Sequence, residues 1–159
     1  MSIVNNSPAF RLDYGDDLKA TPHKHEGKFA IVTDGKIAIA SAATPLVYGV
    51  IADPDAYATA QAGNLTGATL IGLSFPGVVQ VQVGSSGSVT AHSTLFALND
   101  DGTVSASSGA NGDIIVARAA ETTNTVAGSL VAATLINPPR CIVTNVDDAS
   151  DTNNDTSAQ

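Results

Sequence analysis

Short apolar runs with a period of two dominate this chain and limit what it can fold into. The clearest is GVVQVQV (77–83), in which Val79, Val81 and Val83 fall on one face of an extended segment. A period of two is the pattern of a β-strand with one buried face. Similar runs recur at close spacing, separated by turn-forming residues, which predicts an all-β sandwich or barrel.

Two turn sequences predict hairpins. KFAIVTDGKIAIA contains Asp34-Gly35, a pair that readily supplies the positive φ angles of a tight turn. NDDG lies between TLFAL (94–98) and TVSAS (103–107) and predicts a second hairpin. The other predicted strands are PLVYGVIA (45–52), ATLIGL (68–73), GVVQVQV, DIIVARA (113–119) and SLVAATLI (129–136).

Three further segments complete the prediction. Residues 53–64 are the helix candidate, with Asp53 as N-cap, and an irregular loop is the alternative. Asn137-Pro138-Pro139 should end the last strand, after which CIVTNV (141–146) adds an edge strand or begins the tail. No internal repeat of fixed length is evident.

We divide the chain into three parts. Residues 1–27 mix charges with prolines and show no sustained period, which predicts an extended N-terminal arm with little core of its own. Residues 28–146 form a compact β-barrel or β-tulip body of short antiparallel strands with at most one short helix. Residues 147–159 are polar and acidic, without a hydrophobic anchor, and predict a disordered tail.

Charge is distributed unevenly along the chain. The net charge is -8, which disfavours nucleic acid as a partner because phosphate binding depends on cations. Residues 1–36 contain every lysine and are neutral overall, whereas residues 37–159 have only Arg118 and Arg140 as cations. A body with so few cations is expected to present much of its polar surface to other protein, and an ordinary Ser/Thr-rich surface is the alternative.

The sequence contains no secretory signal or membrane-spanning run, so we expect synthesis in the cytoplasm and no membrane partner. Cys141 is the single cysteine, which rules out an intramolecular disulfide. A metal site would need His23 and His25 to converge with His92, whereas a solvated or partner-facing segment is the alternative for the histidine pair.

Paired aspartates at 53 and 55, 100 and 101, and 147 and 148 fit turns or the tail better than acid–base catalysis. GSSGS (84–88) precedes a strand instead of a helix, which argues against a phosphate site. We therefore expect a structural protein with no enzymatic activity and no cofactor.

The order of motifs over residues 30–137 resembles the capsid decoration, or cement, proteins of tailed bacteriophages. A strand hairpin is followed by YGVIADPD, then by GVVQVQVGSSGSVTAHSTLFALNDDGTVSAS and then by GDIIVARAAETTNTVAGSLVAATLI. The resemblance implies a β-barrel or β-tulip protomer that forms a homotrimer on the outer surface of the virion. It also implies binding to the major capsid protein near three-fold or quasi-three-fold positions, which stabilises the shell against internal DNA pressure.

Two sets of contact residues follow from this resemblance. Decoration proteins often engage the capsid through a terminal arm, so we expect Arg11, Lys24 and Lys28 to contact it. The uncharged Gln80 and Gln82 are expected at a subunit interface, where amides pair without the desolvation cost of charges. A solvent-facing edge is the alternative for these two. A host-surface or glycan-binding virion module and a small cupin-like metal enzyme are the rival functions.

Overall fold

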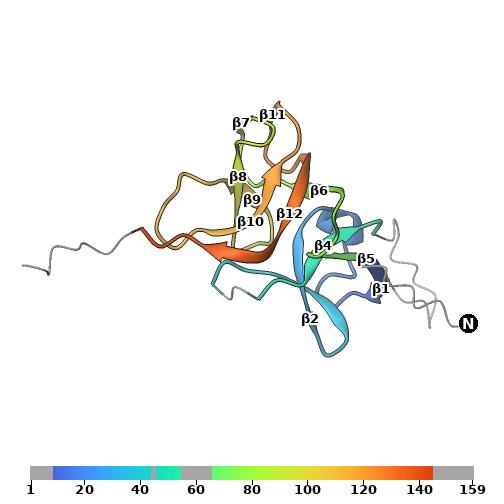
Figure 1. Ribbon diagram of the computed structural model, residues 1–159. Helices are drawn as coiled ribbons and strands as arrows, with labels where there is room; N and C mark the ends of the chain where they lie inside the picture. Colours follow the sequence, from blue (N-terminus) through green and yellow to red (C-terminus); the bar gives the residue numbers. More distant parts are fainter. Residues whose placement is uncertain (1–8, 44–45, 55–65, 145–159) are drawn as a thin grey trace, which may run out of the picture.

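The computed structural model describes residues 9–43, 46–54 and 66–144, which form almost entirely antiparallel β-structure (Figure 1). A first five-stranded sheet has the order β1-β5-β4-β2-β3. Its strands are β1 (Ala9–Asp13), β2 (Phe29–Thr33), β3 (Lys36–Ile39), β4 (Gly49–Ala52) and β5 (Gly67–Gly72). A short 3-10 helix, η1 (Pro22–His25), precedes β2.

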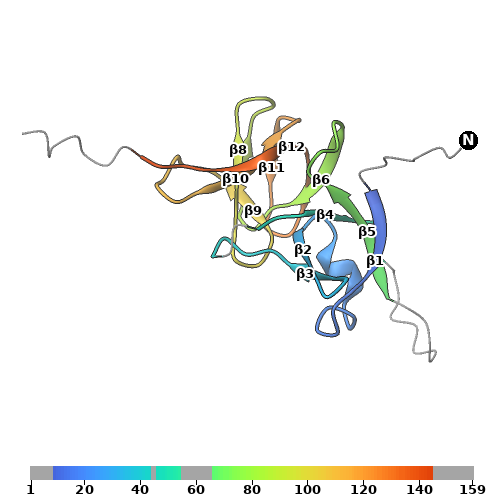
Figure 2. The same ribbon diagram turned by 60° about the horizontal axis from the view of Figure 1, so that its bottom comes forward.

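A second five-stranded sheet has the order β6-β12-β10-β8-β9. Its strands are β6 (Val78–Gln82), β8 (Leu95–Leu98), β9 (Val104–Ala106), β10 (Ile114–Ala119) and β12 (Leu130–Cys141). A two-stranded ribbon of β7 (Gly87–Val89) and β11 (Thr123–Thr125) projects from this sheet, at the top of Figure 1. We call the described residues up to Phe75 the N-terminal lobe and residues 78–144 the C-terminal lobe. Figure 2 shows the two sheets side by side.

Each sheet curls until its two edge strands meet at one end. In the N-terminal lobe, Tyr14 and Ile37 form a parallel bridge, and Gly15 N donates to Ile37 O at 2.9 Å. In the C-terminal lobe, Val83 and Val104 form an equivalent parallel bridge, and Gly84 N donates to Val104 O at 2.8 Å. The predicted all-β, barrel-like fold is therefore confirmed, in the form of two small curled sheets.

The two lobes repeat one topology. When β7 and β11 are left aside, each sheet has five strands, and their spatial order by position along the chain is first, fifth, fourth, second, third in both sheets. The first and last strands pair in the same register, with Asp13 opposite Gly67 in one lobe and Gln82 opposite Leu130 in the other. The sequence has no evident repeat of fixed length, so the repeat is one of topology and strand register.

The middle strands repeat as well. Phe29 pairs with Val50 in the N-terminal lobe, and Leu95 pairs with Arg118 in the C-terminal lobe. By these registers Ala30 occupies the position of Phe96, and both are fully buried. Different side chains thus fill equivalent core positions, as is possible when the total volume of a core is maintained.

Two hydrophobic clusters result from this arrangement. The smaller one fills the N-terminal lobe and consists of Tyr14, Leu18, Ala30, Ile37, Ile51, Ala68 and Leu70. The larger one fills the C-terminal lobe and also takes in Phe29, Ala40, Val50 and Leu73 from the N-terminal lobe. The lobes therefore share one core across their junction.

Backbone hydrogen bonds strengthen the junction. Gly27 N donates to Ile51 O at 2.8 Å, and Gly27 O accepts from Gln82 N at 2.8 Å. Phe29 N donates to Gly102 O, in the turn between β8 and β9, at 2.7 Å. These bonds hold the segment before β2 against both sheets.

The expectation of an extended arm over residues 1–27 is wrong from residue 9 onward. β1 pairs along its whole length with β5, and Tyr14 and Leu18 are 0% and 6% exposed. The charged residues of this segment alternate with apolar ones that enter the core, and this mixed pattern concealed the strand. Residues 1–8 lie outside the described part of the chain.

Other expectations have separate outcomes. The Asp34-Gly35 turn is confirmed, since Thr33 pairs with Lys36 and both turn residues have positive φ. The prolines do not end the last strand, because β12 continues through them to Cys141, with a cis bond between Asn137 and Pro138. Most of the helix candidate at 53–64 and the tail at 147–159 lie outside the described residues.

Candidate interaction surfaces

The three basic residues expected to contact a capsid lie on the folded N-terminal lobe. Arg11 is exposed on β1, and its Nη1 donates to Asp53 O at 3.4 Å. Lys24 is exposed in η1, and Lys28 is half-buried just before β2. Lys24 and Lys28 come from one short connection, whereas Arg11 comes from an edge strand of the sheet.

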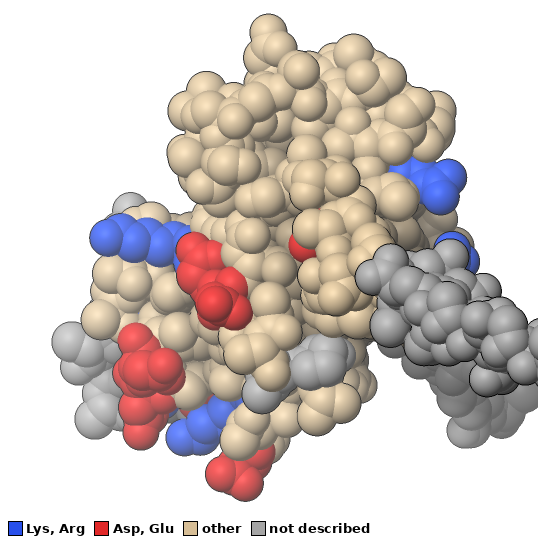
Figure 3. All heavy atoms as spheres, turned by 90° about the vertical axis from the view of Figure 1, so that its left-hand side faces the viewer, with Lys and Arg blue, Asp and Glu red and all other residues tan. Residues whose placement is uncertain are grey.

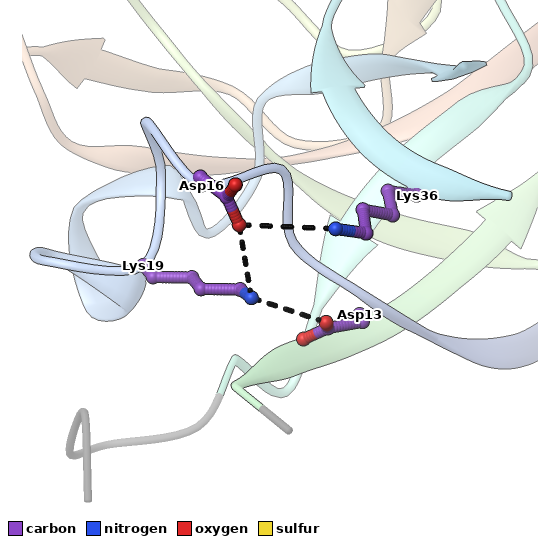
Figure 4. Close-up of polar contacts among 4 residues, drawn as sticks. All are labelled: Asp13, Asp16, Lys19 and Lys36. Atoms are coloured by element: carbon purple, nitrogen blue, oxygen red, sulfur yellow. Dashed lines mark ion pairs between the residues drawn. The ribbon is translucent and has the colours of Figure 1, made fainter. Parts of the chain in front are cut away.

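Two other lysines of the N-terminal segment form ion pairs within the lobe (Figure 4). Lys19 Nζ lies 3.3 Å from Asp13 Oδ2 and 3.2 Å from Asp16 Oδ1, and Lys36 Nζ lies 3.8 Å from Asp16 Oδ1. The hydrogen bond from Lys19, followed by the charge of Lys36, lowers the pKa of Asp16. This cluster joins β1, the following loop and β3, so Lys19 and Lys36 have an internal role.

The two glutamines of the β6 strand differ in their surroundings. Gln80 is exposed and lines a groove with Glu26, Ile51 and Asp53 at the junction of the lobes. Gln82 is half-buried, and its Nε2 donates to the carbonyl oxygens of Lys24 and Glu26, each at 3.2 Å. The Gln82 amide nitrogen is therefore used within the chain, and the expectation that Gln82 lies at a subunit interface stays a prediction. Gln80 stays a candidate.

The surface of the C-terminal lobe carries little charge. Its charged residues are Asp100, Asp101, Asp113, Arg118, Glu121 and Arg140. Figure 3 shows one face of the molecule, with the charged side chains gathered mainly on its lower part and an almost uncharged upper part. The projecting ribbon presents Ser86, Ser88, Asn124 and Val126, all of them exposed. The centres of protein interfaces contain few charged residues, and this surface has the same property.

An exposed apolar group on the N-terminal lobe was missed by sequence reasoning. Phe10 is 36% exposed and Tyr48 is 46% exposed, and their rings meet edge to face with centroids 5.4 Å apart. Leu46, beside Tyr48, is 77% exposed. Aromatic residues make up only 4% of the chain, so each one is a candidate for a special role. The grouping of Phe10 with Tyr48 depends on the pairing of β1 in the sheet, which the sequence pattern does not predict.

The histidines do not form the metal site of a cupin-like enzyme. His23 and His25 lie in η1 and not on one face of a strand, and His92 lies in the turn between β7 and β8 of the other lobe. Within the described residues, no group of three or more His, Cys, Asp or Glu side chains is placed to hold a metal ion. His25 instead packs edge to face on Tyr14, with ring centroids 5.6 Å apart.

The aspartate pair at the β8–β9 turn has the structural role expected for it. Asp101 Oδ1 accepts from Thr103 N at 3.1 Å and from Thr103 Oγ1 at 2.6 Å, and Asp100 Oδ1 accepts from Ser41 Oγ at 3.1 Å. Burial acts to raise the pKa of Asp101, but the hydrogen bonds from Thr103 outweigh it and the pKa is lowered. This carboxylate therefore stabilises the turn.

No protein-family model matches the chain, and no curated protein matches it either. None of the helical segments in the described part of the chain has the length and apolar character needed to cross a membrane.

Proposed function

We propose that the chain is a structural decoration protein that binds the outer face of a tailed-phage head as a homotrimer and braces the shell. The observation that carries the proposal is where the family-like motifs fall on the fold. They begin with the β2–β3 hairpin and β4 and continue through consecutive strands from β6 to β12. The resemblance thus spans a complete curled sheet together with three strands of the other sheet.

The distribution of charge supports a division of roles. The C-terminal lobe has few charged side chains, which suits burial against other copies of the protein, since a desolvated charge is costly unless it is paired. The N-terminal lobe carries Arg11, Lys24 and Lys28 on its surface, which suits contact with acidic groups of the major capsid protein.

Co-sedimentation with expanded heads tests this function. Heads assembled from the major capsid protein of the same virus are mixed with increasing amounts of the protein and pelleted. We expect saturable binding and a higher temperature of head disruption at saturation. No binding to either unexpanded or expanded heads, combined with specific retention on glycans or host cells, would favour the rival host-surface module.

The basic residues are tested by neutralising them together, as Arg11→Gln, Lys24→Gln and Lys28→Gln. We expect the affinity for heads to fall by about tenfold, with a weaker dependence on salt than that of the wild type. Arg140→Gln, an exposed cation on the other lobe, is the matched control and should bind like the wild type. Unchanged binding of the triple variant would remove these residues from the contact.

A further inference from the structure

Each curled sheet has a closed end, where its edge strands meet, and an open end. In the C-terminal lobe, Val79 and Val116 mark the open end and are 4% and 0% exposed. They belong to the cluster that also contains Val50 and Leu73 of the N-terminal lobe. The N-terminal lobe therefore seals the open end of the C-terminal lobe.

The equivalent end of the N-terminal lobe is not sealed. Phe10 pairs with Leu70 as Val79 pairs with Ala133, so Phe10 and Val79 occupy the same position of the repeat. Tyr48 precedes Gly49 in β4 as Val116 precedes Ala117 in β10, and these two strands also correspond in register. The two valines are buried, whereas the two aromatic residues are exposed.

The exposed aromatic residues border a groove. Phe10, Tyr48 and Leu73 line it together with Asn137 from β12. Leu46, 77% exposed, lies at the rim of an adjoining groove lined by Ile31 and Tyr48. Exposed aromatic and aliphatic side chains grouped around a groove are typical of protein interfaces.

We propose that this open end is sealed by the C-terminal lobe of a second copy of the chain, in a head-to-tail contact that repeats the contact between lobes. Within one chain the N-terminal lobe contributes Phe29, Ala40, Val50 and Leu73 to the cluster that contains Val79 and Val116. Of these, Val50 lies in β4 and lines one groove with Val79, and Leu73 directly follows β5. Their equivalents by register are Arg118 in β10 and Ile136 in β12. These two residues would meet the aromatic pair of the neighbouring copy.

The side chains of the two proposed contact surfaces are chemically complementary. Arg118 is exposed on β10. A guanidinium group packs favourably on the face of Tyr or Phe, and arginine and aromatic residues are enriched at interfaces. A head-to-tail contact is also the kind that closes cyclic assemblies, so it is compatible with the proposed trimer. The inference rests on the homotrimer of the proposed function, but its test uses the protein alone and does not involve a capsid.

Sedimentation velocity of the full chain tests the contact. The wild type should sediment as an oligomer at about 100 µM, and Tyr48→Ser and Arg118→Glu should each raise the dissociation constant at least about tenfold. Leu46→Ser changes a side chain too exposed to affect folding and should weaken assembly in the same direction. Val143→Asp, 69% exposed just after β12, is the matched control and should assemble normally.

Mixing the variants gives the decisive result. Tyr48→Ser retains an intact C-terminal lobe and Arg118→Glu retains an intact N-terminal end, so an equimolar mixture should recover a 1:1 complex that neither variant forms alone. Circular dichroism confirms that each variant is folded. A monomeric wild type, unaffected assembly of Leu46→Ser, or failure of the mixture to associate would each overturn the head-to-tail contact. If head binding persists while the contact fails, the decoration function stands and only the interface is wrong.

Discussion

Gly35 and Gly102 occupy equivalent positions in the two hairpin turns of the repeat, but their surroundings differ. Both have positive φ, 74° and 79°. A Cβ on Gly35 would meet nothing within 4 Å, whereas one on Gly102 would lie 2.8 Å from Phe29 O and 2.6 Å from Ile39 Cγ2. The second turn is pressed against the N-terminal lobe, so its glycine is needed both for conformation and for space.

This pair gives a matched prediction. Gly35→Ala should lower the free energy of unfolding by about 1–2 kcal/mol, the cost of a left-handed conformation for alanine. Gly102→Ala should cost about 3 kcal/mol or more, because overpacking against the other lobe is added to that strain. Urea denaturation measures both. Equal losses of unfolding free energy in the two variants would show that the turn at Gly102 is not tightly packed against the N-terminal lobe.

His25 makes stability dependent on pH. Burial lowers the pKa of His25, and the charge of Lys28 lowers it further. The folded pKa therefore lies below the unfolded value near 6.5, so the stability contribution is complete above about pH 6.5. It is lost as the pH falls from there through the folded pKa, because the unfolded chain then binds the proton more readily.

We therefore expect the melting temperature to be level from pH 8 to pH 7 and to fall by about 2 °C more between pH 7 and pH 5 than in His25→Gln. Differential scanning fluorimetry at constant ionic strength measures the difference. His92→Gln changes an exposed histidine of the C-terminal lobe and should retain the wild-type slope. Identical slopes for wild type and His25→Gln would exclude this histidine as the cause.

At the scale of the elements, β1 is the strand whose role most differs from expectation. It closes the N-terminal sheet, because the chain bonds to β5 along Ala9–Asp13 and then bridges to β3 at Tyr14. The loop that follows supplies Leu18 and Pro22 to the buried interior and ends in the backbone bonds around Gly27. Residues 9–27 are thus an integral part of the N-terminal lobe and do not form a separate arm.

Truncation separates the two interpretations. Removing residues 1–27 should abolish the cooperative unfolding transition, because it removes an edge strand and the fully buried Tyr14. Removing residues 1–8 retains β1 and should leave a folded protein. Circular dichroism melting curves of both variants test this. A stable fold without residues 9–27 would restore the interpretation of the whole segment as an arm.

At the scale of the whole molecule, the repeated topology does not produce two independent domains. The larger hydrophobic cluster includes Phe29 and Val50 of the N-terminal lobe together with Val79 and Val116 of the C-terminal lobe. Backbone bonds at Gly27 and Gly102 also cross the junction. Separation of the lobes would expose much of this shared core to water.

We expect a single unfolding transition in scanning calorimetry, with equal calorimetric and van't Hoff enthalpies, because neither lobe retains a sealed core without the other. Residues 78–144 expressed alone should be aggregated or unfolded for the same reason. Two resolved transitions, or a folded C-terminal fragment, would contradict the shared core.

The sequence by itself determined the fold class and most of the strands. The alternating valines of β6, the Asp34-Gly35 turn and the runs that became β5, β8 and β10 all have local causes, namely side-chain period and turn conformation. The uneven distribution of charge was also readable, and it survives as the difference between the two lobes.

The tertiary structure alone decided the repeat. The sequence similarity of FAIVTDG and FALNDDG aligns Phe29 with Phe96, but the strand registers place Ala30 at the position of Phe96. The reason is the longer second turn, in which Asn99 N bonds Thr103 O around Asp100, Asp101 and Gly102. One additional turn residue shifts which side chain enters the core, and only strand pairing reveals the shift.

Tertiary structure also decided the candidate surfaces. Gln82 appeared free in the strand pattern, but the carbonyl oxygens of Lys24 and Glu26, distant in sequence, occupy its amide nitrogen. Phe10 and Tyr48 come from different strands and become one exposed group only when β1 and β4 are placed in the sheet. Period and composition act within a strand, whereas burial depends on which distant segments arrive beside it.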